Sequence, residues 1–270
     1  MTTVSPEING VPLFTKDEWD AHAAHVTREM QEFTKPFMTP ISKVIDDDYG
    51  EAWGTGSYIE LDKRPHILTN DHVARALEAN SLGHQFMGND SVYRATQPFH
   101  SFDLPFDVAV SEVERRIWNN RPHNSAVIPE EKWALAHLPL ERELLFVKGF
   151  AGADARFLFG ALFSQATSYT CQEVKLPSDS RFHSRFHFGL DYRPDLAKRL
   201  DERDLPIPRG FSGSLVWNTR FVETHLRKET WTPESAQVTG LVWGWPSSAA
   251  FLVATRAEYI RSFLLRVLEQ

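Results

Sequence analysis

The chain has 270 residues, of which 42% are hydrophobic and 24% charged, and these values exclude a disordered or collagen-like protein. Its formal net charge is −7, with arginine and lysine scattered among the acidic residues. A nucleic-acid binder needs a clustered basic face, so we expect no nucleic-acid partner. No stretch approaches eighteen apolar residues, so the sequence predicts no membrane-spanning helix and no membrane partner.

The single cysteine and the N-terminal segment indicate in which cellular compartment the protein is found. Cys171 is the only cysteine, and a single thiol cannot form an internal disulfide. The segment Met1–Gly10 lacks the basic stretch and apolar run of a secretory signal. Together these features predict a cytoplasmic location. We expect Cys171 to be buried and inert, since it lies in an aromatic, strand-like region.

The first predicted element is a helix over residues 15–33. Thr15 and Glu18 have the spacing of a capping box, in which each side chain satisfies a free backbone donor at the start of a helix. Apolar residues then recur at helical spacing from Trp19 to Met30.

From about residue 38 the pattern changes to short runs rich in β-branched and aromatic residues, separated by turn residues. Ten such strands with little helix between them indicate a sandwich or barrel rather than repeated βαβ units. The predicted strands are Ile41–Ile45, Gly56–Leu61, His66–Thr69, Val108–Val113, Leu144–Phe150, Ala161–Tyr169, Arg185–Leu190, Ser214–Asn218, Val238–Trp243 and Ala250–Thr255.

A second helix is predicted at the end of the chain. Thr255 and Glu258 repeat the capping-box spacing, and an apolar stripe follows from Ile260 to Val267. The highly charged segment Asp195–Asp204 is expected to be a surface loop or a short helix.

The most informative segment is Arg209–Val216, in which Ser212 lies between Gly210 and Gly213. A serine on such a tight turn suits a nucleophile, because glycine lets a backbone N–H turn towards a substrate oxygen. Ser214 stands where the nucleophile elbow of α/β-hydrolases requires a glycine, so that motif is excluded.

A serine nucleophile needs an adjacent base, which in turn needs an orienting group. His72 follows the apolar run Ile67–Thr69 and is expected at the end of a strand. Asp107 begins a buried-looking strand, where an acid is costly unless it has a hydrogen-bond partner such as a histidine. Asp103 competes for this role, but three residues separate it from the strand.

Three segments resemble the trypsin-like serine peptidases, especially their bacterial HtrA-like branch. Gly54–Val73 resembles the strand pair that ends in Leu-Thr-x-x-His. Asp107–Val110 resembles the Asp-Ile-Ala-Leu strand, and Gly210–Ser214 resembles the Gly-x-Ser-Gly-Gly turn. They occur in the order His, Asp, Ser, which is the order of chymotrypsin. The resemblance covers roughly residues 38–268, and we expect no PDZ segment after it.

The resemblance implies an all-β fold of two packed six-stranded antiparallel β-barrels, with an added helix at each end. The expected division is a helical extension over 1–37, a first barrel over 38–122, a second barrel over 123–256 and a terminal helix over 257–270. The active site would lie in the cleft between the barrels.

The resemblance also implies the roles of the site residues. His72, Asp107 and Ser212 would form the catalytic triad, and the N–H groups of Gly210 and Ser212 the oxyanion hole. No metal or organic cofactor is expected. The residues expected to bind substrate are Pro206, Arg209, Val242, Trp243 and Gly244.

Three positions depart from the family pattern. Phe211 replaces the acidic residue that pairs with a new N-terminus after zymogen cleavage, so we expect no activation of that kind. Ser214 replaces a glycine and is small enough to be tolerated. Asp71 puts a second carboxylate next to His72, where it acts on the imidazole or points to solvent.

The predicted function is a serine endopeptidase acting on peptide or protein substrates. Two alternatives remain open, namely an inactive protease-like module that binds peptides and an esterase with the same triad. A regulatory protein partner is also left open, because a cytoplasmic protease needs restraint. His183 and His187 invite a zinc site, but no further ligands follow at matching intervals.

Overall fold

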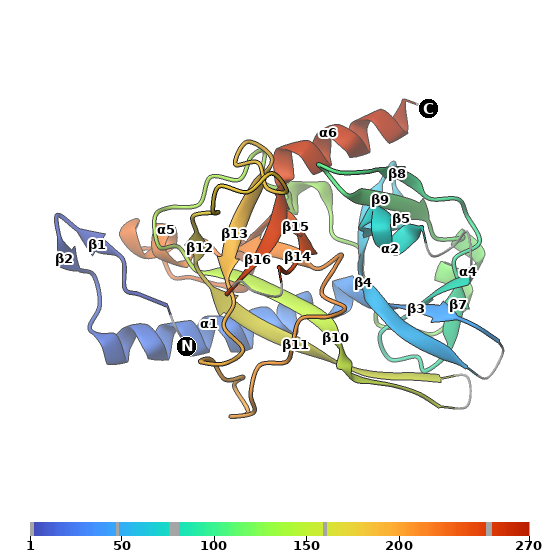
Figure 1. Cartoon of the computed structure of the whole chain (residues 1–270), viewed down its shortest axis with the longest axis horizontal. Coiled ribbons are helices and arrows are strands. Elements are labelled where there is room, and N and C mark those ends of the chain that lie inside the picture. Colours follow the sequence, from blue (N-terminus) through green and yellow to red (C-terminus); the bar gives the residue numbers. More distant parts are fainter. Residues whose placement is uncertain (1–2, 47–48, 76–80, 159–160, 247–249, 270) are drawn as a thin grey trace.

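The computed structural model describes residues 3–46, 49–75, 81–158, 161–246 and 250–269. Its strands form one hairpin and two seven-stranded antiparallel sheets, which lie side by side (Figure 1). None of the described helices is long and apolar enough to cross a membrane. The predicted all-β class is confirmed.

The first sheet has the order β7-β6-β3-β4-β5-β9-β8. Its two outer members, β7 and β8, are consecutive strands joined by residues 95–99. Counted as two parts of one divided strand, they bring the two edges of the sheet together as in a six-stranded barrel. Its strands are β3 (Met38–Val44), β4 (Gly50–Leu61), β5 (Arg64–Thr69), β6 (Ser81–Gln85), β7 (Val92–Arg94), β8 (His100–Phe102) and β9 (Val108–Glu112).

The second sheet closes in the same way. Its order is β11-β10-β14-β15-β16-β13-β12, and only Gln172 separates the outer members β11 and β12 in the chain. Each barrel therefore has the expected six strands, one of them divided. The strands are β10 (Leu145–Leu158), β11 (Ala161–Cys171), β12 (Glu173–Val174), β13 (His187–Asp191), β14 (Leu215–Asn218), β15 (Gln237–Gly244) and β16 (Phe251–Arg256).

The helices and the remaining short elements lie outside the two sheets. The helices are α1 (Lys16–Thr34), α2 (Asp71–Ala74), α4 (Arg115–Asn120), α5 (Phe221–Leu226) and α6 (Ala257–Leu268). The 3-10 turns are η1 (Lys35–Phe37), η2 (Glu130–Lys132) and η3 (Pro233–Ser235), and the hairpin is β1 (Glu7–Ile8) with β2 (Val11–Pro12).

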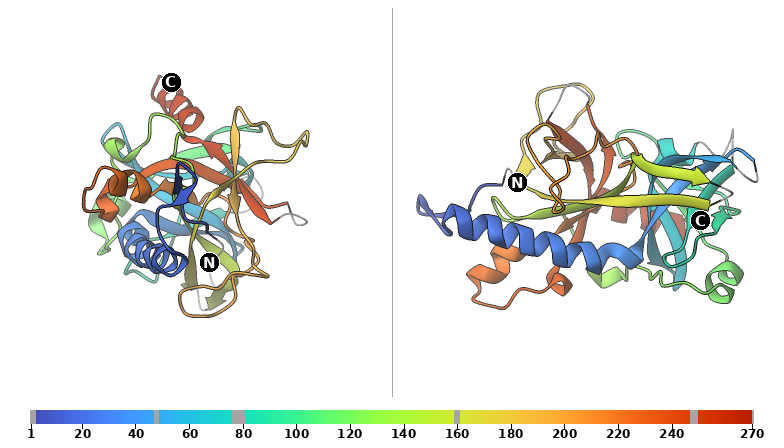
Figure 2. Two further views of the ribbon diagram at one scale, coloured as in Figure 1. Left: turned by 90° about the vertical axis from the view of Figure 1, so that its left-hand side faces the viewer. Right: turned by 90° about the horizontal axis from the view of Figure 1, so that it is seen from below.

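Helix α1 lies along the length of the molecule beneath the second barrel (Figure 2). It starts with the predicted capping box, in which Thr15 and Glu18 bond to each other's backbone N–H. Its apolar stripe from Trp19 to Met30 is buried in a core cluster that both barrels and α6 also enter. The helix is thus part of the shared core.

The ten predicted strands all occur, but the C-terminal capping box does not. Helix α6 begins after Arg256, which makes no side-chain cap. The Thr255 hydroxyl donates to the carbonyl oxygen of Phe106 instead, and the Glu258 carboxylate accepts from the N–H of His137. Because both side chains bond to distant segments, neither caps the start of α6. The segment 195–204 is a loop with turns, as one of the two expectations had it.

Candidate active site

His72 belongs to the first barrel. It is the second residue of the short helix α2, which follows strand β5. Its side chain is 44% exposed, so the ring is open to solvent on one side. Asn70, at the turn between β5 and α2, is buried and donates its amide hydrogen to the carbonyl oxygen of Asp107 at 2.6 Å. The end of β5 is thereby tied to the segment that carries the acid.

Two hydrogen bonds join His72 to Asp107. The backbone N–H of His72 donates to Oδ1 at 3.0 Å, and the ring Nδ1–H donates to Oδ2 at 2.6 Å. The carboxylate is an acceptor only, so Nδ1 carries the hydrogen, and in the neutral imidazole the lone pair is therefore on Nε2. That is the tautomer a general base requires.

The two other acidic residues near the base are paired with one arginine. Asp103 has a side chain that is 67% exposed, and Arg75 contacts it at 2.9 Å. Arg75 also contacts Asp71 at 2.5 Å, and this carboxylate is buried. The expectation that Asp71 points to solvent is therefore wrong, because its guanidinium partner lets the charge stay inside.

Two consecutive type II turns form the segment 208–214, and Ser212 lies in the second. The first turn is closed by the Phe211 N–H bonding to the Pro208 carbonyl, and the second by the Ser214 N–H bonding to the Phe211 carbonyl. A type II turn needs positive φ at its third residue, and Gly210 and Gly213 supply it with φ of 98° and 89°.

Neither glycine of this double turn can be replaced. A Cβ at Gly210 would lie 2.3 Å from the carbonyl oxygen of Phe150, and one at Gly213 only 1.8 Å from that of Thr55. Both backbones pass so close to a neighbouring strand that only glycine fits.

Strand β4 of the first barrel holds the turn in place. The N–H of Thr55 donates to the carbonyl of Ser212 at 2.8 Å, and its hydroxyl donates to that of Gly210 at 2.7 Å. A Cβ built on Gly54 would meet both Val73, which follows His72, and the Ser212 carbonyl at 3.0 to 3.3 Å. The structure thus brings the carbonyl of Ser212, the predicted nucleophile, and the side chain of Val73, which follows the predicted base, to the same point of β4.

Two backbone donors of the turn are available for a substrate. Among the described residues, the N–H groups of Gly210 and Ser212 find no backbone acceptor, while those of Phe211, Gly213 and Ser214 do. Free donors beside a serine hydroxyl are what an oxyanion hole consists of.

The buried side chain of Phe211 holds the turn against the second barrel. Its ring is buried in the core of the second barrel, 5.7 Å from the ring of Tyr192 and against Gly149. Apolar burial therefore fixes the turn at the position where the sequence departs from the acidic residue of the resembled family.

Strand β15, which carries the predicted substrate-binding residues Val242, Trp243 and Gly244, is hydrogen-bonded to the same turn. The Gly213 N–H donates to the Val242 carbonyl at 2.9 Å, so β15 runs alongside the nucleophile segment. Trp243, Gly244 and Pro206 are half-buried, and Arg209 is exposed. The small side chain of Ala249 is predicted from the sequence to leave room beside these substrate-binding residues, but the residue lies outside the described residues.

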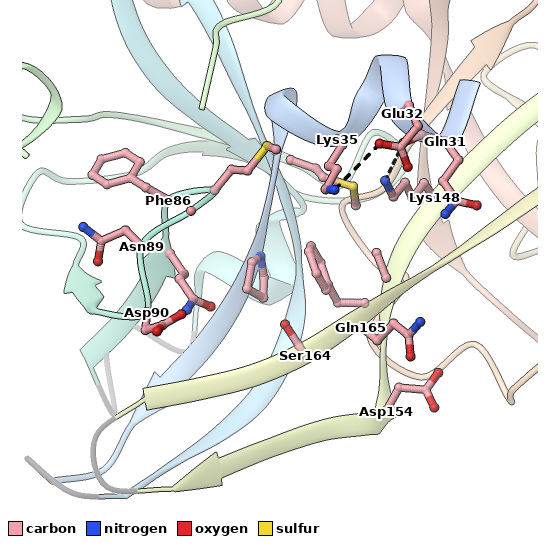
Figure 3. Close-up of a pocket in the computed structure, with 17 residues that line it drawn as sticks. Gln31, Glu32, Lys35, Phe86, Asn89, Asp90, Lys148, Asp154, Ser164 and Gln165 are labelled. Atoms are coloured by element: carbon pink, nitrogen blue, oxygen red, sulfur yellow. Dashed lines mark hydrogen bonds and ion pairs between the residues drawn. The ribbon is translucent and has the colours of Figure 1, made fainter. Parts of the chain in front are cut away.

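A cavity of about 770 Å³ lies beside strands β10 and β11 (Figure 3). It is bordered by the end of α1, by the segment after β6 and by the β10–β11 hairpin, with Lys148 and Phe150 among its residues. Phe150 connects it to the nucleophile turn, since its N–H donates to the Thr55 hydroxyl that bonds to Gly210. Sequence reasoning missed this cavity, because the segments that form it share no motif.

The remaining reactive side chains are engaged within the chain. His187 donates from Nε2 to the Pro105 carbonyl at 2.6 Å and accepts the His183 N–H at Nδ1, so both nitrogens have partners. The described residues contain no cluster of three metal-ligating side chains. Cys171 is buried as expected, and burial raises the pKa of its thiol well above the usual range.

No protein-family model matches the chain, and no curated protein matches it in sequence. Among solved structures, the inactive form of Rv3671c from M. tuberculosis H37Rv, a Ser-to-Ala mutant, superposes with a TM-score of 0.52 at 17% identity, over 92% of this chain and 94% of that one. The chain has the chymotrypsin-like double-barrel fold. The MamO protease domain from Magnetospirillum magneticum is 10% identical, with a TM-score of 0.49 over 85% of this chain and 96% of that one. Sequence identities this low establish a common fold alone.

Proposed function

We propose that this double-barrel protein is a serine endopeptidase whose triad is His72, Asp107 and Ser212. The observation that carries the proposal is the pair of hydrogen bonds from His72 to Asp107, at 3.0 and 2.6 Å. The position of Ser212 supports it further, since Thr55 fixes the serine's turn against the strand that Val73 also contacts.

Each group has a distinct role in the proposed reaction. The Ser212 hydroxyl attacks the peptide carbonyl while His72 takes its proton at Nε2, and His72 later gives that proton to the leaving amine. Asp107 holds the imidazole in the required tautomer. The N–H groups of Gly210 and Ser212 stabilise the oxyanion, and water then hydrolyses the acyl-enzyme.

The proposed specificity follows from the second barrel. In the resembled family the base of the primary pocket lies about six residues before the nucleophile, and a carboxylate there pairs with a buried basic side chain of the substrate. Pro206 stands at that position in this sequence and carries no charge. Trp243 and Trp245 are both half-buried, and in the proposed pocket their indoles narrow the wall opposite Pro206. We therefore propose cleavage after small or medium uncharged residues.

Two other functions would use the same fold. A binding module would hold peptides without cleaving them, and an esterase would use the same triad on a different bond. The Nε2 lone pair of His72 favours activity over the binding module, because binding alone has no use for that tautomer. The HtrA-like branch, a cytoplasmic location and a regulatory partner remain parts of the proposal.

The test combines a serine-reactive probe with a peptide panel. A fluorophosphonate should label the wild-type protein and not Ser212→Ala, since only an activated serine reacts. Peptides that differ only before the scissile bond should be cleaved best after small uncharged residues. Absence of labelling would support the binding module, and hydrolysis of esters alone would support the esterase. A preference for Arg or Lys before the scissile bond above about tenfold, or about 1.4 kcal/mol in transition-state binding, would contradict the proposed specificity for small or medium uncharged residues.

A further inference from the structure

The backbone of Asp107 is held in an unfavourable conformation. Its φ is 46°, in the left-handed region that residues other than glycine rarely adopt. Its side chain is only 4% exposed and makes both bonds to His72. A residue keeps such a conformation only when several contacts with its surroundings hold it there.

The surroundings that fix Asp107 come largely from the opposite barrel. His187 on β13 donates from Nε2 to the carbonyl of Pro105 at 2.6 Å. Thr255 on β16 donates its hydroxyl hydrogen to the carbonyl of Phe106 at 2.8 Å. These are the two residues directly before Asp107, which itself belongs to the first barrel.

The two donors form a single structural unit. His187 and Thr255 are direct cross-strand partners in the pairing of β13 with β16, and both side chains are buried. Asn70 of the first barrel holds the next carbonyl, that of Asp107, at 2.6 Å. Three successive carbonyls are thus bound by three buried side chains, two from one barrel and one from the other.

The hydrogen-bond pattern makes His187 a dedicated donor. Its Nδ1 accepts the backbone N–H of His183 at 3.1 Å, so the ring hydrogen is on Nε2 and points to Pro105. Burial lowers the pKa of His187, which keeps the ring neutral and this arrangement intact. An imidazole with both nitrogens engaged in this way does not exchange protons with a substrate.

We propose that His187 and Thr255 are positioning residues, which hold Asp107 in register with His72 from across the interface between the barrels. The inference rests on the proposed peptidase function. It means that the acid–base pair reaches its working geometry only when the two barrels are docked, because the second barrel supplies two of the three bonds.

The experiment compares variants that remove one donor with variants that keep it. Thr255→Val and His187→Phe should lower kcat about 10- to 100-fold with little change in KM, since small displacements of catalytic groups cost up to about 100-fold. Thr255→Ser and His187→Gln keep a donor and should recover most of the rate.

A matched control separates positioning from stability. The buried Thr34 hydroxyl also donates to a carbonyl, that of Met30 at 2.7 Å, within helix α1 and without contact to Asp107 or His72. Thr34→Val should lower thermal stability as Thr255→Val does and leave kcat unchanged. In an Asp107→Asn background, Thr255→Val should cause no further loss of rate, because it acts through that acid. Equal losses in both backgrounds, or loss of stability without loss of kcat, would overturn the inference.

A spectroscopic readout keeps the inference separate from the proposed function. The proton between His72 Nδ1 and Asp107 should give a downfield resonance, assigned by its disappearance in Asp107→Asn. Thr255→Val should shift or broaden this resonance, and Thr34→Val should not. If the wild-type protein proved inactive, the proposed function would fail, while this comparison would still decide the positioning role. An unchanged resonance in both Thr255→Val and His187→Phe would refute it.

Discussion

Burial separates the two acidic residues that compete to orient His72. Asp107 is 4% exposed and bonded twice to the histidine, whereas Asp103 is 67% exposed and paired with Arg75. The sequence allowed this choice, because Asp107 directly precedes an apolar strand and an acid there needs a partner. Asn70 offered no comparable signal. Its partner is a backbone carbonyl, and any residue supplies one.

The two acids should respond very differently to the same substitution. Asp107→Asn should lower kcat by roughly 10⁴, because an amide can donate to Nδ1 and so favours the wrong tautomer. Asp103→Asn should be nearly silent, since it removes only an exposed ion pair. Steady-state kinetics of both variants on one peptide measures this. A larger loss for Asp103→Asn would reassign the acid.

At the scale of elements, the N-terminal helix was predictable and its docking was not. The capping box and the apolar spacing of α1 are local features, and both occur as predicted. One contact that ties the end of α1 to the second barrel is the bond from Lys148 Nζ to the Gln31 carbonyl at 2.7 Å. A lysine in the middle of a predicted strand gives no sign of this, because its long side chain can reach many partners.

Lys148 should make stability depend on pH. It is only 8% exposed, and burial lowers the pKa of its amine from 10.5 to about 8. Between these values the unfolded chain binds a proton that the folded chain lacks, so this residue's contribution to the free energy of unfolding rises with pH.

The comparison with Lys148→Met isolates that contribution. The free energy of unfolding of the wild type minus that of the variant should rise by up to about 3 kcal/mol from pH 8 to 10.5, at about 1.4 kcal/mol for each pH unit. Urea unfolding of both proteins at a series of pH values provides the measurement. A difference that stays constant or falls with pH would show that the amine is solvated in the folded state.

At the scale of the whole molecule, the ten strands with β-branched and aromatic runs were predictable, and the short ones were not. Strands β6, β7 and β8 have three to five residues with several polar side chains, so they lack a readable alternation. Barrel closure depends on these pieces, and it was expected from the resemblance alone. The contacts across the barrel interface also escaped prediction, because they join residues far apart in sequence.

In the proposed mechanism a base from the first barrel and a serine from the second act as one unit. The most direct measurement is kcat for Ser212→Ala, His72→Ala and the double variant on one peptide substrate. Each single change should cost on the order of 10⁶, and the double change should cost little more, since removing either group already removes the shared step. Losses that multiply in the double variant would show that the two residues act independently and would contradict the account.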